Sequence, residues 1–344
     1  MNLTFYSFFN ESGVAQGTRD WIYALSEKHN ISISNISNNE PNWTLFKDRS
    51  KFQNNKILET MFMSVLPDQQ NRIDFKGKKT IGAAIFESTS PPKYWKDILS
   101  KNDVVVSPST FCQKAFNSIG VNPILFPHTI DLNLYKESQN KLFSKDRPVI
   151  GFLGTCRERK GVFNLVRAFN EVFSENEAIL YLKIDNASQL FDVIPKIRKQ
   201  KNIIIDLKRY NEIQIAELMK SFDLFVLPTM GEGFSIPTLQ SMALGVPILV
   251  TNWSGHTDFC KDNNSWLIEP DEISFLKTLD GYPQFFNCEW AKIKQTTLQD
   301  ALKRVFNLLG SDEVKSKIKN GLQEVKKYDY KACLENFELI EKNL

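Results

Sequence analysis

The sequence lacks the features that mark a secreted or membrane-spanning protein. Its five cysteines are odd in number and scattered, with neither CxxC spacing nor pairing with histidine, so we expect no disulfide framework and no zinc site. No stretch approaches 18 uninterrupted apolar residues, and residues 1–10 carry no basic residue ahead of a long apolar core. We therefore predict a cytoplasmic protein without a membrane span, and peripheral contact with a membrane stays open.

The chain also lacks an excess of one charge. Its 43 Lys and Arg against 40 Asp and Glu give a formal net charge of +3, too little to support general binding of nucleic acid. What it has is length and an ordinary composition: 344 residues, 42% hydrophobic and 24% charged. These values are typical of two globular domains.

Several catalytic patterns are missing as well. The sequence shows no Ser/His/Asp set, no paired carboxylates in one loop and no DxD metal motif beside the glycine-rich stretch 231–250. The first expected strand is not followed by GxGxxG spacing or by an acidic residue about 20 positions later, as a nicotinamide-binding fold requires. An oxidoreductase of that type is therefore poorly supported.

Strands alternate with helices through the first part of the chain, which predicts a parallel, doubly wound sheet. The expected strands are 3–9, 31–36, 80–86, 103–107 and 121–126, and helices are expected after Thr18 and at 94–99 and 110–118. Residues 38–79 are polar and rich in Asn and Lys, with one helical patch at 57–66. The loop with Gly13 and Gly17 could bring backbone close to a ligand or form an ordinary tight turn.

A second series of strands and helices follows a polar, charged segment at 136–147, where we place a domain boundary. The expected strands are 149–153, 179–184, 203–207, 224–227, 248–250 and 266–268, and the expected helices are 162–173, 191–198, 212–222, 292–309, 312–326 and 330–342. We predict an N-terminal Rossmann-like domain at 1–145 and a C-terminal one at 146–325. The helix in 326–344 should pack back on the N-terminal domain.

The stretch 231–250 joins two of these strands through a polar loop and a helix. Pro237 suits the first turn of that helix, because proline has no N–H to lose there and its φ angle is already helical. A strand, a polar loop and a helix N-terminus in this order expose free amide groups to an anion. The sequence therefore predicts that an anion binds at this loop.

The same stretch resembles a motif of the GT-B glycosyltransferases, in particular the large retaining family that includes bacterial mannosyl- and glucosyltransferases, family four. Residues 231–237, Gln240 and residues 242–247 are similar to its EGFGLPxxEAMAxGxPV box. The fold implied is α/β, with two Rossmann-like doubly wound domains that face each other across a cleft.

Three further segments carry the resemblance, in the family's order. Arg159, Lys160 and Gly161 look like its (R/E)KG segment, residues 127–131 like its PHGVD segment, and residues 252–258 like its GGxxE segment. As an ordered set these motifs are specific, whereas any one alone would be weak. The likeness covers most of the chain from Thr80 onward and is thin at 38–79.

The resemblance implies roles for individual residues. Glu232 would bind hydroxyls of the donor sugar, and Lys160, with Arg159 or Arg157, would neutralise the departing diphosphate. Glu87, in a loop at a strand's carboxyl end, would orient the acceptor or the sugar. The catalytic candidates are Glu232, Lys160, Arg159 and Glu87; the donor-binding candidates are Gly13, Gly154, Arg157, Lys160, Arg209, Gly231, Glu232, Gly233, Phe234, Ser235, Ile236 and Gln240.

Structural roles compete with these assignments. A Glu near a helix N-terminus can act as a cap, which is open for both Glu232 and Glu87. The run of charges at 157–160 could be a solvated loop. Phe234, Ser235 and Ile236 would act through their backbone N–H groups, so their side chains carry little information.

The sequence departs from the family pattern at three positions. Thr155 stands where an Arg often precedes the Lys, Gln240 replaces the second acid of the Glu-x7-Glu pair, and Asp258 replaces a Glu. Gln240 can still donate and accept hydrogen bonds, so weaker or altered nucleotide binding is expected. We do not assign His128 or His256 as a catalytic base.

The function implied is transfer, with retention, of a hexose from a nucleoside-diphosphate sugar, UDP- in preference to GDP-, to a hydroxyl acceptor. The acceptor would be a glycan or a lipid-linked or protein-linked glycoconjugate. Neither a metal ion nor a cofactor is expected. The alternative is a catalytically silent GT-B protein that binds nucleotide-sugars or acts as a scaffold.

Overall fold

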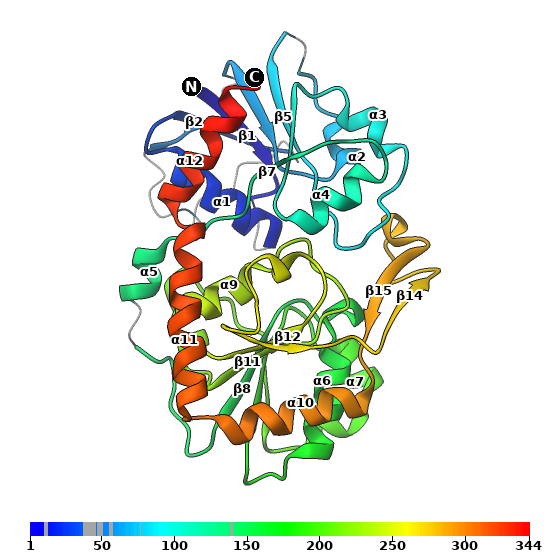
Figure 1. Ribbon diagram of the computed structural model, residues 1–344, viewed down its shortest axis with the longest axis vertical. Coiled ribbons are helices and arrows are strands. Elements are labelled where there is room, and N and C mark those ends of the chain that lie inside the picture. Colours follow the sequence, from blue (N-terminus) through cyan, green and yellow to red (C-terminus); the bar gives the residue numbers. More distant parts are fainter. Residues whose placement is uncertain (10–12, 37–45, 47–50, 55–57, 76, 138–139) are drawn as a thin grey trace. The chain divides into compact units, whose positions relative to one another are not determined.

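A computed structural model describes the chain except for residues 10–12, 37–45, 47–50, 55–57, 76 and 138–139. The chain forms two compact units, drawn in Figure 1. Unit 1 comprises Met1–Asp131 together with Lys326–Leu344, and unit 2 comprises Leu132–Val325. Each unit is described by itself.

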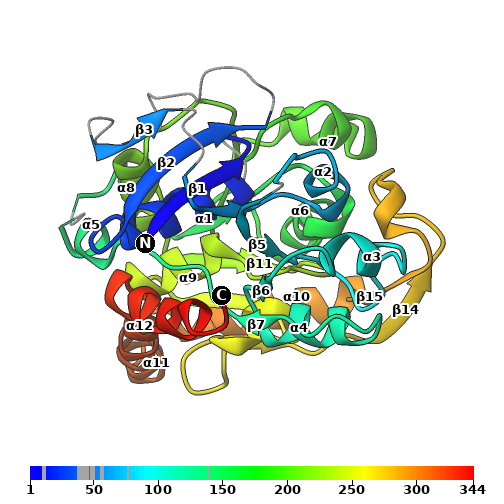
Figure 2. The same cartoon turned by 90° about the horizontal axis from the view of Figure 1, so that it is seen from above.

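Unit 1 is built on a parallel sheet of seven strands in the order β3-β2-β1-β4-β5-β6-β7. The strands are β1 (Asn2–Ser7), β2 (Asn30–Asn35), β3 (Gln53–Asn54), β4 (Thr60–Met63), β5 (Lys79–Ala83), β6 (Val104–Ser107) and β7 (Ile124–Leu125). Figure 2 shows β3, β2 and β1 side by side. The helices of this unit are α1 (Gly13–Leu25), α2 (Pro67–Gln70), α3 (Trp95–Leu99), α4 (Thr110–Asn117) and α12 (Tyr330–Glu341).

Aromatic side chains fill the core of unit 1 around Trp21. The Trp21 ring stacks on Phe62, Phe126 and His128 with centroid distances of 5.3, 5.1 and 4.3 Å. Its indole N–H donates to the carbonyl of Pro127 at 2.9 Å. Burial lowers the pKa of His128 to about 3, against a smaller raising effect of its hydrogen bond with the backbone of Gly17. His128 is therefore a neutral core residue.

The prediction of a helix at 57–66 is wrong for the residues of this range that the structure describes. Residues 60–63 form β4, which pairs with β1 and β5, and residues 55–57 lie outside the described part of the chain. All four side chains of β4 are buried. A strand buried on both faces shows no alternation of apolar and polar residues, so its pattern cannot be told from that of a short buried helix.

Unit 2 has a parallel sheet of six strands in the order β10-β9-β8-β11-β12-β13. These are β8 (Val149–Leu153), β9 (Ile179–Lys183), β10 (Ile203–Asp206), β11 (Leu224–Leu227), β12 (Ile248–Thr251) and β13 (Trp266–Ile268). A separate antiparallel pair, β14 (Glu272–Leu276) and β15 (Cys288–Lys292), was not expected from the sequence. With the sheet of unit 1, this architecture confirms the predicted α/β class with two doubly wound parallel domains.

The helices of unit 2 are α5 (Leu132–Glu137), α6 (Val162–Val172), α7 (Ser188–Val193), α8 (Glu212–Lys220), α9 (Ile236–Ala243), α10 (Gln295–Leu308) and α11 (Asp312–Glu324). They include α5, which the sequence did not predict, and α7, which ends at Val193 inside the range 191–198 expected to be helical. In α6 the buried side chains include Leu165, Val166 and Phe169, and this helix packs against α10. Figure 1 shows α9 and α11 side by side.

The division between the units lies at Asp131, earlier than residue 145 where the charged segment had suggested it. Helix α5 explains the difference, because it contacts α8 and α9 of unit 2. The backbone N–H of Leu142 also donates to the carbonyl of Glu217 in α8, at 3.1 Å. At the other end of the chain, α12 packs against α1 inside unit 1.

In the part of the chain that the structure describes, no helix combines the length and apolar character needed to cross a membrane.

Candidate active site

Loops from three neighbouring strands of unit 2 meet at one edge of its sheet. Strands β8, β11 and β12 are adjacent and parallel, so their carboxyl ends lie together. In open α/β sheets ligands bind at this edge. The loop after β8 carries residues 154–161, the loop after β11 carries residues 228–235, and the loop after β12 carries residues 252–258.

The first two loops bring Glu232, Lys160 and Arg159 into one buried cluster. The Lys160 Nζ lies 2.6 Å from Glu232 Oε1, and Arg159 Nη1 lies 3.6 Å from the same oxygen. The side chains of Lys160, Arg159 and Glu232 are only 15%, 11% and 7% exposed. Three candidates from two separate motifs thus lie in one cluster.

The charges of this cluster do not cancel. Burial alone would raise the pKa of Glu232, but attraction from Lys160 and Arg159 outweighs it and holds the pKa below its usual value. Glu232 is therefore ionised at neutral pH. One carboxylate between two cations leaves a single positive charge in a largely buried site, which favours binding of an anion.

Thr229 organises the loop that carries Glu232. Its hydroxyl lies 3.2 Å from Glu232 Oε1, 3.0 Å from the carbonyl of Arg159 and 3.1 Å from the carbonyl of Gly231. The guanidinium of Arg159 also donates to the Gly231 carbonyl, at 2.6 Å. Thr229 therefore ties the two loops together. Sequence reasoning missed this residue, because a threonine after a strand is too common to be a signal.

Two glycines allow the loops to approach so closely. Gly161 has φ of 72°, and a Cβ there would lie 2.0 Å from the carbonyl oxygen of Pro228. A Cβ on Gly255 would lie 2.2 Å from the carbonyl oxygen of Gly233. Ser254 completes the contact, since its Oγ accepts from the N–H of Glu232 at 2.9 Å. Ser254 was also missed, although it lies within the matched 252–258 segment.

Helix α9 begins directly after this loop. Ser235 precedes it with φ of 77°, a left-handed conformation that is rare outside glycine, and its Oγ lies 2.8 Å from Thr238 Oγ1. No acidic residue stands in the first turn, where the leading N–H groups have no partner within the helix. The Phe234 side chain packs on Phe259, with ring centroids 5.2 Å apart. The N-terminus of α9 therefore suits an anion next to the Glu232 cluster.

Gln240 lies one turn further along α9 and is buried. Its Nε2 donates to the hydroxyl of Tyr135 on α5, at 2.7 Å. The amide that replaces the family's second acid is thus held by a neutral partner. Tyr135 could not have been found from the sequence, because it is 105 positions away and belongs to no motif.

Aromatic rings from the loop before β15 support the cationic loop. Arg157 lies over the ring of Tyr282 at 5.6 Å, and Arg159 lies over Phe285 at 5.8 Å. The N–H of Glu158 donates to Asp280 Oδ1 at 3.0 Å. The run at 157–160 is therefore an anchored segment.

Of the remaining candidates, Gly154 and Arg209 belong to unit 2, and Gly13 and Glu87 belong to unit 1. A Cβ on Gly154 would be 3.9 Å from Lys160 Cδ, so Gly154 borders the cluster, whereas Arg209 is exposed in the segment after β10. In unit 1, Gly13 starts α1, where an added Cβ would meet no atom within 4 Å, and Glu87 is half-buried after β5. Gly13 and Glu87 stay predictions.

His256 is a buried neutral residue beside the site. Burial lowers its pKa, although the hydrogen bond to the Thr251 carbonyl and the charge of Glu232 act in the opposite direction. Its Nε2 donates to that carbonyl at 2.6 Å, which leaves Nδ1 without a proton. The lowered pKa makes His256 a weaker base, and the side chain is fully buried, so we still do not assign it as a catalytic base. Among the described residues, no group of three or more His, Cys, Asp or Glu is placed to hold a metal ion.

Comparisons with known proteins agree with this architecture. Residues 135–279 match the family model of Glycosyl transferases group 1. The capsular polysaccharide biosynthesis glycosyltransferase CapM of Staphylococcus aureus is 26% identical over 53% of this chain and 47% of that protein. An Escherichia coli UDP-Gal:alpha-D-GlcNAc-diphosphoundecaprenol alpha-1,3-galactosyltransferase is 30% identical over 33% of this chain and 25% of that protein. The matches thus cover less than half of either relative.

Two solved structures match over nearly the whole chain. HepE from Anabaena in complex with UDP and glucose has a TM-score of 0.72 at 12% identity, with all of both chains covered. Sucrose-phosphate synthase from Thermosynechococcus elongatus has a TM-score of 0.72 at 14% identity, covering 99% of this chain and 98% of that one. The fold is therefore that of the GT-B glycosyltransferases.

Proposed function

We propose that this protein transfers a hexose from a UDP-sugar, in preference to a GDP-sugar, to a hydroxyl of a glycan or of a lipid- or protein-linked acceptor, with retention at the anomeric carbon. One observation carries the proposal. The ionised Glu232 is held between Lys160 and Arg159 in a buried site of net positive charge, beside the N-terminus of α9.

Each part of the site suits one part of such a donor. The diphosphate is an anion that the α9 N-terminus and the two cations would attract. Lys160 and Arg159 both approach Glu232 at Oε1, and a carboxylate can accept hydrogen bonds from two sugar hydroxyls. The Lys160 ammonium has three N–H donors, so it can bond Glu232 and a phosphate oxygen together.

The reaction would need no nucleophile from the protein. The bond from the anomeric carbon to the diphosphate oxygen breaks, and the acceptor oxygen bonds to that carbon on the same face. The acceptor's proton passes to the departing diphosphate oxygen. Lys160 and Arg159 would stabilise the charge that develops on the diphosphate, a contribution of several kcal/mol in a buried site. No metal ion is required in this scheme.

The choice of UDP and of the acceptor class draws on relatives. HepE was solved with UDP and glucose, and the Escherichia coli relative is named for UDP-Gal and for a diphosphoundecaprenol acceptor. CapM is named for capsular polysaccharide biosynthesis. We extend a UDP-sugar donor and a glycan or lipid-linked acceptor to this chain on that basis. All five cysteines are free and buried, which suits a reducing cytoplasm.

A donor screen tests the proposal without knowledge of the acceptor. UDP- and GDP-hexoses are incubated with the protein, and slow hydrolysis is followed by release of the nucleoside diphosphate. Proton NMR then identifies the first anomer formed. We expect turnover of a UDP-hexose and a first product with the donor's own anomeric configuration. A first product with the opposite anomeric configuration would contradict retention. Turnover of GDP-sugars alone would contradict the proposed preference for UDP-sugars.

The silent alternative is favoured by one contact, the bond from Gln240 to Tyr135, which occupies an amide group where the family has an acid. Calorimetry with UDP distinguishes the two functions. Binding of UDP without hydrolysis or transfer of any donor supports a silent binding protein. Hydrolysis of a donor supports the enzyme. The variant Asp192→Asn serves as a control that should retain this hydrolysis, since Asp192 is an exposed residue of α7.

A further inference from the structure

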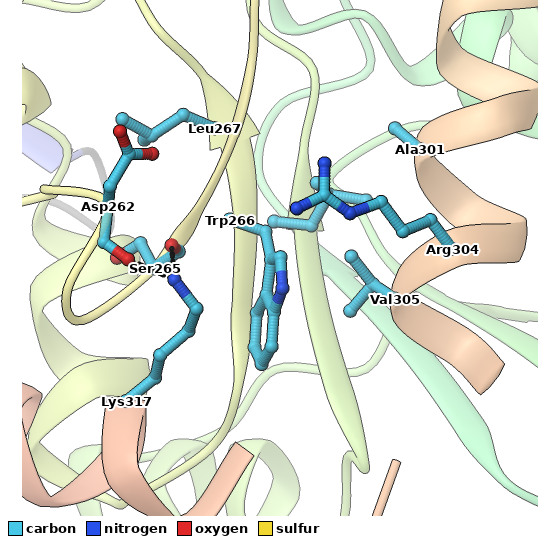
Figure 3. A pocket seen from close by; sticks show the side chains of 9 residues that line it. Asp262, Ser265, Trp266, Leu267, Ala301, Arg304, Val305 and Lys317 are labelled. Carbon is cyan, nitrogen blue, oxygen red and sulfur yellow. Dashed lines mark hydrogen bonds between the residues drawn. The ribbon is translucent and has the colours of Figure 1, made fainter. Parts of the chain in front are cut away.

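A small cavity lies at the edge strand of the unit 2 sheet, apart from the Glu232 cluster. Its volume is about 70 Å³, and its walls come from β12, β13, α10, α11 and the loop before β13. Since one water needs roughly 10–15 Å³ of such space, the cavity holds several waters or one small ion, and no nucleoside. Figure 3 shows the side chains that line it.

Trp266 supplies a hydrogen-bond donor to this cavity. The residue is 4% exposed, and its Nε1 has no hydrogen-bond partner in the part of the chain that the structure describes. A buried indole N–H without an acceptor destabilises the folded protein. In Figure 3 this nitrogen lies on the ring edge that faces Val305 and Arg304. An acceptor on that side would satisfy it.

Two cations line the same cavity. Arg304 comes from α10 and is exposed, so its side chain can move to admit a ligand. Lys317 comes from α11; its Nζ lies over the Trp266 ring at 5.1 Å and donates to the carbonyl of Ser265 at 3.0 Å and to that of Asp262. Burial lowers the pKa of Lys317, which reflects the cost of its partly desolvated charge.

One carboxylate belongs to the wall and must be weighed against the cations. In Figure 3, Asp262 lies on the Lys317 side of the Trp266 ring, away from Arg304. With Arg304, Lys317 and Asp262, the wall keeps a net positive charge. The wall offers an indole N–H and a guanidinium, which are donors that bind tetrahedral oxyanions.

We propose that this cavity is a binding site for a phosphate-class oxyanion, held by the Trp266 indole N–H and the Arg304 guanidinium with Lys317 nearby. The site is independent of the donor-sugar function proposed above, since none of its three side chains belongs to the Glu232 cluster.

The Trp266 indole N–H gives a direct test by ¹⁵N NMR. The chain has six tryptophans, and the variant Trp266→Phe identifies the signal of Trp266 by its loss. Inorganic phosphate is the probe, with chloride at equal ionic strength as the comparison. We expect phosphate to shift this signal saturably while chloride leaves it in place. An equal effect of both salts, or no saturable shift with phosphate, would overturn the proposal.

Three variants test whether the shift reports phosphate bound in this cavity. Arg304→Gln should weaken phosphate binding about tenfold, the effect of losing one hydrogen bond to a charged group. Lys303→Gln is the matched control, because Lys303 is an exposed cation on the same helix as Arg304 and does not line the cavity. Lys160→Met should leave the phosphate-induced shift of the Trp266 signal unchanged. Loss of this shift in Lys160→Met would mean that the signal reports phosphate bound at the Glu232 cluster, which would contradict the proposal.

Discussion

The pair formed by Lys160 and Glu232 should be strongly coupled, because it is buried and lies close to a second cation. Replacing Lys160 by Met leaves a carboxylate that is 7% exposed with Arg159 at 3.6 Å and the Thr229 hydroxyl at 3.2 Å. Breaking a buried pair by removing one partner costs about 3–5 kcal/mol, and the two remaining partners place Lys160→Met near the lower end, about 3 kcal/mol. The double variant Lys160→Met/Glu232→Gln removes the buried charge and should regain most of this loss.

The pH dependence of the loss follows from the pKa of Glu232. In the native protein the cations hold the pKa of Glu232 low. The stability that the Glu232 carboxylate contributes is therefore present above its pKa in the unfolded chain, and it is lost as the pH falls through its pKa in the folded protein. Without Lys160, less attraction opposes the effect of burial, so we expect the pKa of the carboxyl to rise. Folding then favours the protonated form, so Lys160→Met should be less destabilised at about pH 5 than at about pH 8.

Hydrogen exchange of the β11 amides measures the effect locally, which avoids assuming that two units unfold as one. The free energy of opening is compared for the native protein, both single variants and the double variant. We expect a coupling energy of about 2–3 kcal/mol. A coupling below about 0.5 kcal/mol, with the single losses simply adding, would refute the buried ion-pair interpretation.

Three further predictions concern other features. Because the folded pKa of His128 is about 3, the unfolded chain takes up its proton first, and His128 should cost unit 1 about 2 kcal/mol between pH 8 and pH 5, a contribution that His128→Asn removes in urea titrations while that of His29 remains. Gly161→Ala should destabilise unit 2 by more than about 2 kcal/mol, whereas Gly281→Ala, which shares a φ of 72° but has open space around it, should cost only about 1–2 kcal/mol in thermal unfolding. Donor hydrolysis should survive EDTA in full, and a strict requirement for Mg²⁺ or Mn²⁺ would contradict metal independence.

The sequence predicted the parallel strands of both units wherever an apolar run was bounded by turn residues, as in β11 and β12. It failed at β4, whose four buried side chains give no alternation. It also missed the pair β14 and β15, where Phe275 is 67% exposed and the burial pattern does not mark one face as inside. Each strand of such a pair is determined by the strand it pairs with, which the local sequence pattern does not reveal.

The same limit applies to the site. Glu232, Lys160 and Arg159 belong to ordered motifs, so they could be predicted, and the structure brings them within one cluster. Thr229 and Tyr135 act through bonds to residues that are distant in sequence, and no spacing rule identifies them. The net charge of the cluster could not be predicted either, because only the structure shows that both cations share one carboxylate.

Glu232 carries the central claim, and replacing it tests that claim most directly. Glu232→Gln keeps the shape of the side chain but removes its charge, while Glu158→Gln makes the same change at an exposed position of the adjoining loop. Hydrolysis or transfer from the best UDP-hexose is measured for both, with circular dichroism to establish that the fold is retained. We predict a loss of about a hundredfold in Glu232→Gln, from lost hydrogen bonds to a charged group, and native turnover in Glu158→Gln. Native turnover in both variants would contradict the proposal.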